Sequence, residues 1–476
     1  METVLVALPC NPGCRRVNVL DSLKRRPLEL LPSLATLRQR HDIARLTSCF
    51  SCAESEVDAG NSIDIAKHVL VEFGEILSIG TLCAFLAQKI KVPDVVTFLL
   101  AGMLMGPEVA GHLLGTDTIG VINIKADSAL NQLILIFGSC YILFDGGATL
   151  RLKVLKEVWI TILVMSTLGV LITTFATGLV AHYVLGVPLI VALLLAATIA
   201  STDPATLVPV FKQVKIKAKV AQTVMSESAF NDAMGAIITL TILGIAMGQG
   251  EFSLADAAVK LIKESVLGIL AGGVLGYLAA WLIAHEKFDY LAEYAPVVSL
   301  MAVIGAYLSA DGMHASGFMG VFVFGIMLGN KEMFGFRMEG EEEELLEHFI
   351  LTTAFIMRMF IFILLGSQVD FALMNKYLAS GVIIVTFFML VARPLTVFLC
   401  AAPDWRAKWT LNELLFMCWT RETGVIPAAL AGILVGLKAP MADMIASVTF
   451  IAVLMTIIIQ ATTTKWLGDR LGLLER

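Results

Sequence analysis

Long apolar runs, each of about 20 residues, follow one another along most of this chain. A helix of that length matches the thickness of a bilayer's hydrocarbon core. The composition agrees, because hydrophobic residues make up 58%, charged residues 16%, and the mean hydropathy is +0.84. A soluble protein carries about 25% charged residues. The sequence therefore predicts an all-α polytopic membrane protein. A transmembrane β-barrel is excluded, because its strands would be alternating segments of about 10 residues.

We expect thirteen transmembrane spans from residue 66 onward. They run near 66–88, 94–106, 128–146, 158–184, 187–210, 226–246, 258–284, 291–309, 314–329, 345–366, 376–400, 412–435 and 441–464. Residues 1–65 form a polar N-terminal tail with eight Lys or Arg, and residues 465–476 a short C-terminal tail. The transmembrane domain is thus expected at 66–464. The net charge of -6 gives no basic footprint for nucleic acid.

Loop charges orient the spans. Roughly seventeen Lys or Arg fall in the loops and C-terminus of one side, against three in the loops of the other. By the positive-inside rule, the C-terminus is cytoplasmic and an odd span count places the N-terminus outside. The basic tail contradicts that placement unless it is not native or the count is off by one. We expect a multi-pass protein of the plasma membrane, or of the inner membrane in a bacterium.

The cysteines predict no metal or redox centre. Cys49 and Cys52 form a C-x-x-C in the tail, but no histidine completes a zinc spacing and no strand–helix context accompanies them. The chain also lacks a Walker loop, a G-x-G-x-x-G and an H-E-x-x-H. We therefore expect no cofactor, no use of ATP and no enzymatic activity.

Two short motifs recur at one spacing. Gly102-Met-Leu-Met-Gly106 in the second span recurs as Gly325-Ile-Met-Leu-Gly329 in the ninth, about 223 residues later. Pro204-Ala-Thr-Leu207 and Pro427-Ala-Ala-Leu430 share that offset. Because seven spans separate the partners, the second copy is inverted in the membrane. Inverted repeats with helices broken at Pro204 and Pro427 are typical of a secondary transporter whose site lies at the midplane.

Charged residues inside the spans point to the site. A charge at the bilayer centre costs ~2.5–3.5 kcal/mol on insertion scales, so each one needs a reason. The residues concerned are Asp203, Glu227, Asp232, Arg358, Arg393, Arg421 and Glu422. Asp203 precedes Pro204, where the helix should open and expose carbonyls near Thr202 as cation ligands. A plain proline kink with Asp203 capping the second half-helix fits the sequence equally well.

The sixth span arranges its polar residues in two columns. With 3.6 residues per turn, Ser228 and Asp232 share one face, and Glu227 and Asn231 lie beside it. Ser228 and Asp232 offer hard oxygen ligands for an alkali cation. A carboxylate in apolar surroundings can be neutralised by a proton or by a cation, but hardly by both.

The arginines are expected to balance buried acids. Arg393 lies among apolar residues of the eleventh span and is the natural partner of Glu227. A structural role of that pair is favoured over a role in transport, because breaking a buried pair is costly. Arg421 and Glu422, taken as neighbours on a helix, neutralise or shield the second break.

The chain resembles the cation:proton antiporter superfamily, and specifically the sodium/proton exchangers of the NhaP type. The resemblance covers roughly residues 66–464 and leaves the tail unmatched. It rests on Thr202-Asp203-Pro204, Glu227-Ser228-x-x-Asn231-Asp232, Arg393-Pro394 and Thr420-Arg-Glu-Thr-Gly424-Val-Ile-Pro427.

The resemblance implies an NhaA-like antiporter fold, with a six-helix core domain, a dimerisation domain and broken helices crossing at the midplane. It implies that Asp232 binds the cation and the proton, with Ser228, Thr202 and Asp203 completing the shell. Glu227 and Asn231 would lie near the site, with Glu227 paired to Arg393. Asn231, where other members carry Asp, points to the electroneutral branch and to one-for-one exchange.

The predicted function is secondary active exchange of Na⁺ or Li⁺ for H⁺ by alternating access at Asp232. We expect the protein to be a homodimer surrounded by membrane lipid. Potassium is the rival cation, because its ligands are the same oxygens. A cation channel lined by the broken helices, or an intramembrane hydrolase using Asp203 and Asp232, are alternatives from other classes. The hydrolase lacks any water-activating motif around its two acids.

Overall fold

The computed structural model describes residues 66–90, 92–111, 121–124, 128–202, 207, 211, 215–248, 254–284, 289–338 and 340–474. The tail at 1–65, with its C-x-x-C, lies outside these residues, and so do Asp203 and Pro204. The chain divides into two compact units, Met1–Leu70 and Val71–Arg476. Of the first unit, only residues 66–70 are described, at the start of the helix Ala66–Ile90.

The described residues are almost entirely helical. Ten helical segments are long and apolar enough to cross a membrane, and three shorter apolar helices accompany them, Leu189–Ala200, Gly317–Gly329 and Val425–Gly436. Many outward side chains are large and apolar, as Ile262, Val266 and Leu270 are along one helix. Such exposure would be costly in water and is expected against lipid tails. The all-helical membrane fold is confirmed, while the exact count of thirteen crossings stays a prediction.

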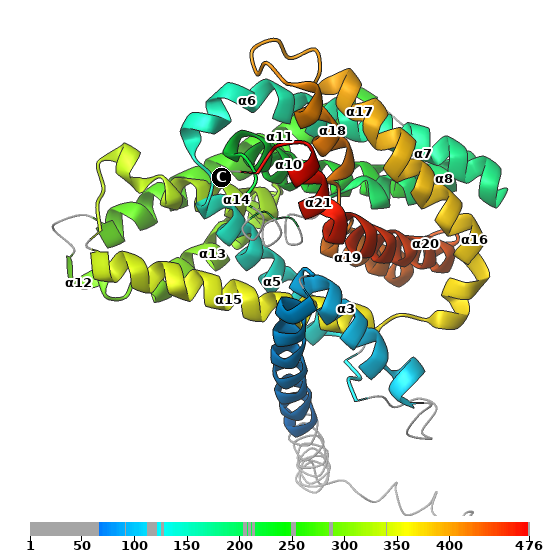
Figure 1. Cartoon of the computed structure of the whole chain (residues 1–476), viewed down its shortest axis with the longest axis horizontal. Helices are drawn as coiled ribbons and strands as arrows, with labels where there is room; N and C mark the ends of the chain where they lie inside the picture. Colours follow the sequence, from blue (N-terminus) through cyan, green and yellow to red (C-terminus); the bar gives the residue numbers. More distant parts are fainter. Residues whose placement is uncertain are drawn as a thin grey trace, which may run out of the picture. The chain divides into compact units, whose positions relative to one another are not determined.

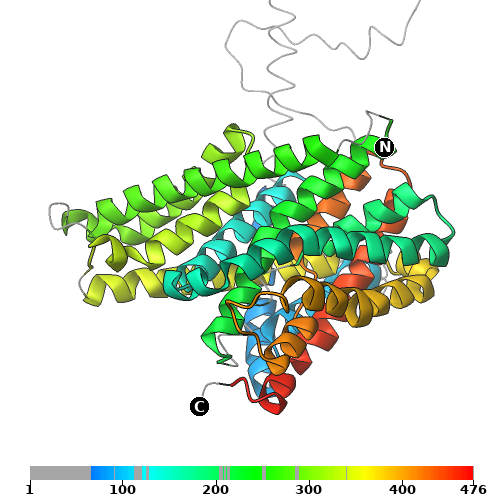
Figure 2. The ribbon, with the colours of Figure 1, turned by 90° about the horizontal axis from the view of Figure 1, so that it is seen from above.

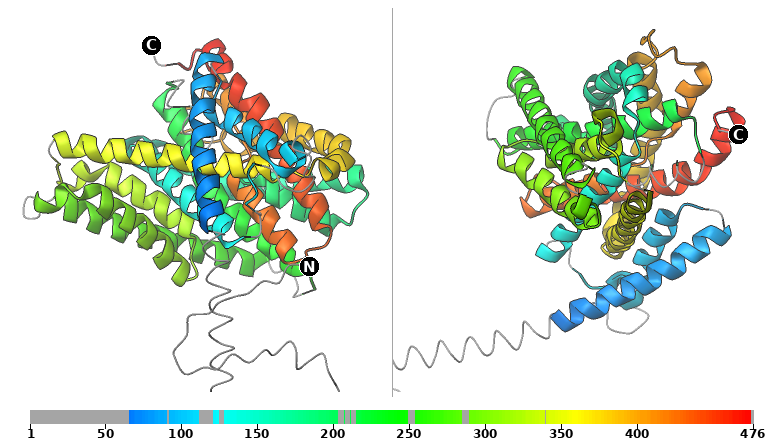
Figure 3. Two further views of the ribbon diagram at one scale, coloured as in Figure 1. Left: turned by 90° about the horizontal axis from the view of Figure 1, so that it is seen from below. Right: turned by 90° about the vertical axis from the view of Figure 1, so that its left-hand side faces the viewer.

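The helices of the second unit pack in two groups. The first contains α3 (Asp94–Met105), α5 (Ala129–Ala148), α11 (Leu254–Ala284), α13 (Ala295–Gly312), α14 (Gly317–Gly329) and α15 (Gly340–Ser367). The second contains α6 (Leu152–Val164), α7 (Val170–Leu185), α8 (Leu189–Ala200), α10 (Ala218–Ala246), α16 (Phe371–Phe387), α17 (Arg393–Cys400), α18 (Leu411–Trp419), α19 (Val425–Gly436), α20 (Ala442–Met455) and α21 (Thr462–Arg470). Figure 1 shows α13 and α14 left of centre and α16–α20 on the right, with α15 running from the left to the centre. Figure 2 and the left-hand view of Figure 3 also keep α13 and α16 on opposite sides.

The recurring glycine motifs serve the same packing in both halves. A side chain at Gly102 in α3 would collide with the backbone carbonyl of Ile363 in α15. A side chain at Gly325 in α14 would likewise collide with the carbonyl of Phe144 in α5. Glycine is therefore needed at both places because the helix backbones touch.

Four π-helical segments lie in the described residues: η2 (Pro107–Gly111) follows α3, and three others each join two helices. These three are η3 (Met165–Gly169) between α6 and α7, η6 (Phe388–Ala392) between α16 and α17, and η7 (Thr456–Ala461) between α20 and α21. Such turns are rare and often lie at functional sites. The segments η3 and η6 begin 223 residues apart, which is the offset of the sequence motifs.

The second broken helix opens earlier than its proline suggests. The chain is non-helical from Thr420 to Gly424, and Pro427 lies within the first turn of α19. Proline is tolerated there, because the first N–H groups of a helix have no partner within it. Arg421 and Glu422 therefore lie in the break itself, so the expectation that they are neighbours on a helix is wrong. At the C-terminus, α21 continues past residue 464, where the transmembrane domain was expected to end.

Candidate functional site

The first broken helix ends at the candidate site. The α8 helix stops at Ala200, and Ser201 continues in an extended conformation with φ -67° and ψ 137°. Ser201 and Thr202 are both buried. Their backbone groups no longer follow the helical pattern, so side chains of other helices must satisfy them.

Asn231 holds this end of the chain through both ends of its amide. Its Oδ1 accepts a hydrogen bond of 2.8 Å from the backbone N–H of Thr202. Its Nδ2 donates to the Thr202 hydroxyl and, over 3.0 Å, to Glu227 Oε1. An amide can accept and donate at once, whereas a carboxylate at this position could only accept. Asn231 therefore fits its surroundings in a way that an aspartate would not.

Asp232 lies beside the same end of α8. Its Oδ1 accepts a short hydrogen bond from the Ser201 hydroxyl, and its side chain is almost completely buried on α10. Ser228 stands one turn earlier on α10 and is fully buried, with no hydrogen bond to its hydroxyl within the described part of the chain. Of the expected cation ligands, Thr202 and Asp232 therefore both lie at the end of α8, where residues of α10 bond to the open chain. Asp203 lies outside the described residues.

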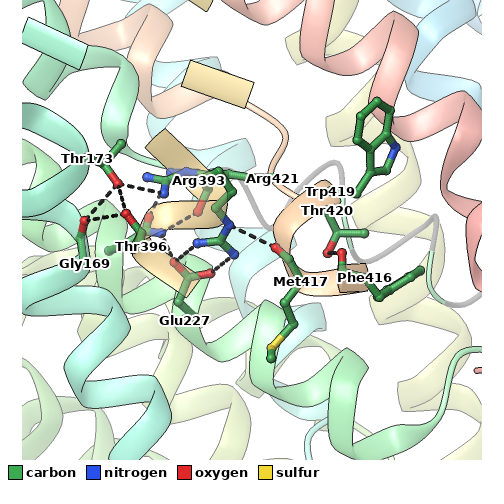
Figure 4. A network of polar contacts seen from close by, with 12 residues as sticks. Gly169, Thr173, Glu227, Arg393, Thr396, Phe416, Met417, Trp419, Thr420 and Arg421 are labelled. Carbon is green, nitrogen blue, oxygen red and sulfur yellow. Dashed lines mark hydrogen bonds and ion pairs between the residues drawn. The ribbon is translucent and has the colours of Figure 1, made fainter. Parts of the chain in front are cut away.

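Glu227 and Arg393 form a buried two-point ion pair. Arg393 donates from its two terminal nitrogens to the two carboxylate oxygens of Glu227, both at 3.0 Å, and from Nε to the Met417 carbonyl at 3.0 Å (Figure 4). Both side chains are at most 1% exposed. Both carboxylate oxygens of Glu227 and three nitrogens of Arg393 thus have hydrogen-bond partners. A buried ion pair is tolerated only when its charged groups are hydrogen-bonded in this way.

Arg421 joins the two breaks. From the segment between α18 and α19, its guanidinium donates to the carbonyl of Ala200, the last residue of α8, and to the Thr173 hydroxyl at 3.3 Å (Figure 4). It also lies 5.2 Å from the ring centre of Phe388. The C-terminal end of a helix carries partial negative charge, so a cation there is favourable.

Arg358 belongs to a different part of the molecule. Its Nη2 lies 3.8 Å from Asp94, which joins α15 to α3, and both side chains are 11% exposed. Arg358 therefore takes no part in the cluster around Asp232. Sequence reasoning missed three residues that do, namely Ser201, Thr173 and Thr396. Ser201 could have been found from its place at the predicted break, whereas the two threonines carry no sequence signal of their own.

A large cavity leads toward the site. It has a volume of about 1080 Å³ and is lined by α5, α10, α13, α19, α20 and the junction of α15 with α16. Its charged lining residues in the described part of the chain are Asp311, Asp370 and Asp443, all acidic. Ala236, one turn beyond Asp232 on α10, belongs to the lining. The cavity can therefore attract cations to within one helical turn of Asp232.

Comparisons with known proteins agree with this geometry. The family model described as sodium/hydrogen exchanger, transmembrane, matches residues 76–470. The Na⁺/H⁺ antiporter 1 of Methanocaldococcus jannaschii is 32% identical over 367 residues, which cover 75% of this chain and 81% of that protein. The K⁺/H⁺ antiporter NhaP of Alkalimonas amylolytica is 26% identical, over 84% of this chain and 66% of its own.

A solved structure shares the fold. The sodium proton antiporter MjNhaP1 of Methanocaldococcus jannaschii, determined at pH 8, superposes with a TM-score of 0.67 at 28% identity. The match covers 85% of this chain and 99% of the other. The NhaP-type resemblance inferred from the motifs is thus confirmed, and the chain belongs to the family of transmembrane sodium/hydrogen exchangers.

Proposed function

We propose that this protein is a secondary active antiporter that exchanges Na⁺ or Li⁺ for H⁺, one for one, by alternating access to Asp232. The observation that carries the proposal is the position of this carboxylate. It is buried on α10, bonded to Ser201 where α8 opens, and one helical turn from a cavity with acidic lining. Ser228, Thr202 and Asp203 complete the proposed shell.

Charge counting supports one-for-one exchange. The described ionisable groups around the two breaks are the acids Glu227, Asp232 and Glu422 and the bases Arg393 and Arg421. With all five charged, one negative charge remains beside that of Asp203, which the proposal takes to keep one protonation state throughout the cycle. A single proton or a single monovalent cation cancels it, so both half-cycles carry the same charge. Proton and cation then compete for Asp232, and low pH weakens the apparent affinity for the cation.

The membrane orientation follows from charges. The excess of Lys and Arg in the loops of one side supports a cytoplasmic C-terminus in a plasma-membrane protein. The cavity's acids Asp311, Asp370 and Asp443 lie next to loops that this orientation assigns to the outside, so the proposal takes the cavity as the external entrance for cations. We also propose that the protein forms a homodimer in the lipid bilayer through a separate dimerisation domain. The proposal includes no enzymatic activity.

Purified protein in vesicles with a pH-sensitive dye tests the proposal. A pulse of sodium or lithium salt should drive proton movement, and chloride salts of impermeant cations should not. The relative from Alkalimonas amylolytica is named a K⁺/H⁺ antiporter, so potassium salts are tested in parallel, and a response to potassium alone would reassign the cation. Cation flux that proceeds without proton flux would instead identify a channel.

A further inference from the structure

Two threonines on different helices form a matched pair. Thr173 in α7 and Thr396 in α17 are separated by 223 residues, and their hydroxyl oxygens lie 2.8 Å apart. The same offset relates the π-helical segments η3 and η6, each of which ends shortly before its threonine. Equivalent positions of two repeats can touch only at the axis that relates the repeats. The pair therefore marks that axis.

The surroundings of the two hydroxyls also correspond. Thr173 lies 2.8 Å from the carbonyl of Gly169, and Thr396 lies 2.9 Å from the carbonyl of Ala392, each four residues earlier in its own chain segment. Both threonines are fully buried. A Cβ at Gly169 would stand 2.8 Å from the methyl carbon of Thr396. The close approach of the two helices thus depends on glycine at this position.

One proton per hydroxyl leaves two ways to combine the bond between the threonines with a bond to the carbonyl four residues earlier. The Gly169 carbonyl is a longer, additional acceptor for Thr396, at 3.5 Å. In the first, Thr396 donates to Thr173, and Thr173 donates to the carbonyl of Gly169. In the second, Thr173 donates to Thr396, and Thr396 donates to the carbonyl of Ala392. Each arrangement is the image of the other when the repeats are exchanged. Neither leaves a hydroxyl proton without an acceptor.

Arg421 connects this pair to the ion site. It donates to the Thr173 hydroxyl and to the last carbonyl of α8, the residue before Ser201, which bonds Asp232. We propose that Thr173 and Thr396 are positioning residues that hold the helix crossing and Arg421 in register in both access states, by reversing the direction of their shared hydrogen bond. The proposal rests on the proposed antiport function and concerns the rate at which the access states interconvert.

The test is a set of threonine variants in vesicles. Thr396→Val keeps the shape of the side chain and the acceptor of Arg421 but removes one hydroxyl. We expect the maximal exchange rate to fall about three- to tenfold, the worth of one hydrogen bond. The half-saturating cation concentration should stay unchanged, because the ligands of Asp232 are untouched. Thr396→Ser should restore the rate.

A double-variant cycle separates switching from packing. Thr173→Val should be slower than Thr396→Val, because Arg421 also loses its acceptor. The double change Thr173→Val/Thr396→Val should be no slower than Thr173→Val alone, since the two hydroxyls act as one unit. Rates that multiply, a serine variant without rescue, or wild-type rates in Thr396→Val would each overturn the proposal.

Asp232→Asn measured beside them keeps the two proposals distinct. If Asp232→Asn still exchanges, the proposed function fails. If Asp232→Asn is inactive while Thr396→Val exchanges at the wild-type rate, only the role of the threonine pair fails. Thermal melts of each variant show whether a slow rate reflects lost folding, and Thr396→Ser supplies a folded comparison should a valine variant not fold.

Discussion

The two halves of the transmembrane region have π-helical segments and glycine contacts at matching positions, but they carry different charged residues. At the 223-residue offset, Asp232 corresponds to Met455 and Glu227 to Phe450, while Arg393 corresponds to Val170 and Arg421 to Thr198. The first half thus holds the α10 carboxylates Glu227 and Asp232. The second half holds Arg393, which binds Glu227, and Arg421, which donates to the end of α8. Each half alone would bury uncompensated charge. The difference explains why neither half could serve as a site by itself.

Neutralising the carboxylate of the first half should have the largest effect. Asp232→Asn removes the charge that binds cation or proton, so we expect exchange to be abolished. The protein should stay folded, because a neutral amide costs less to bury than a carboxylate. Dye dequenching in vesicles and a thermal melt check the two statements. Cation-driven proton flux in this variant would contradict the role given to Asp232.

Removing the matching base of the second half should damage stability instead. Arg393→Ala strands Glu227, and we expect a loss of ~3–5 kcal/mol. Adding Glu227→Gln should recover much of the loss. Arg358→Ala is the control, because its pair with Asp94 is longer and partly exposed, and should cost less. Melting curves with no recovery in the double variant would mean that the two residues are not coupled.

The charged residues of the site could be predicted from the sequence, but the position of the second helix break could not. Glu227, Asp232 and Arg393 are conspicuous in the sequence because charge is expensive in lipid, and the structure pairs Glu227 with Arg393. The position of the second break could not be predicted from Pro427, because a proline is compatible both with a kink and with the first turn of a helix, which is where Pro427 lies in α19. The break is instead held by long-range bonds, such as that from Arg393 to the Met417 carbonyl.

Hydrogen bonds to backbone groups are the part that the sequence conceals. Arg421 donates a hydrogen bond to a carbonyl of α8, and Ser201 donates one to Asp232. The sequence marks Arg421 as a charge within a span, but it identifies neither of these acceptors. The threonine pair is equally inconspicuous in the sequence, because only the structure shows that the two hydroxyls are in contact. The length of the apolar runs therefore predicts the helical membrane fold, and charged residues within those runs predict the acids of the site. The hydrogen bonds that connect the two broken helices become visible only in the folded structure.

Adding a second carboxylate to the first half should unbalance the charges. Asn231→Asp replaces two donated hydrogen bonds by a charge about 3 Å from Glu227. We expect slower exchange that now depends on membrane potential. Asn330→Asp is the matched control, because Asn330 also donates twice, to the carbonyls of Leu150 and Ile326, but lies elsewhere. Potential dependence in both variants, or in neither, would contradict the charge count.

The acids of the cavity should contribute least. Asp443→Asn removes one lining charge without touching the breaks, so we expect about a twofold weaker apparent affinity for the cation at low salt. Added salt should abolish the difference, because exposed charges are screened. Asp469→Asn on α21, outside the cavity lining, is the control. Equal effects of the two changes would mean that the cavity does not guide cations.

Exchange under an imposed membrane potential tests the central claim most directly. Vesicles containing the wild-type protein are clamped at several potentials with potassium and valinomycin, once potassium has been tested as a substrate. One-for-one exchange at a single carboxylate moves no net charge, so rate and end point should be the same at every potential. A net charge crossing the membrane would instead feel ~2.3 kcal/mol per 100 mV. A clear dependence on potential would contradict the single-carboxylate account and implicate Asp203 as a second titrating acid.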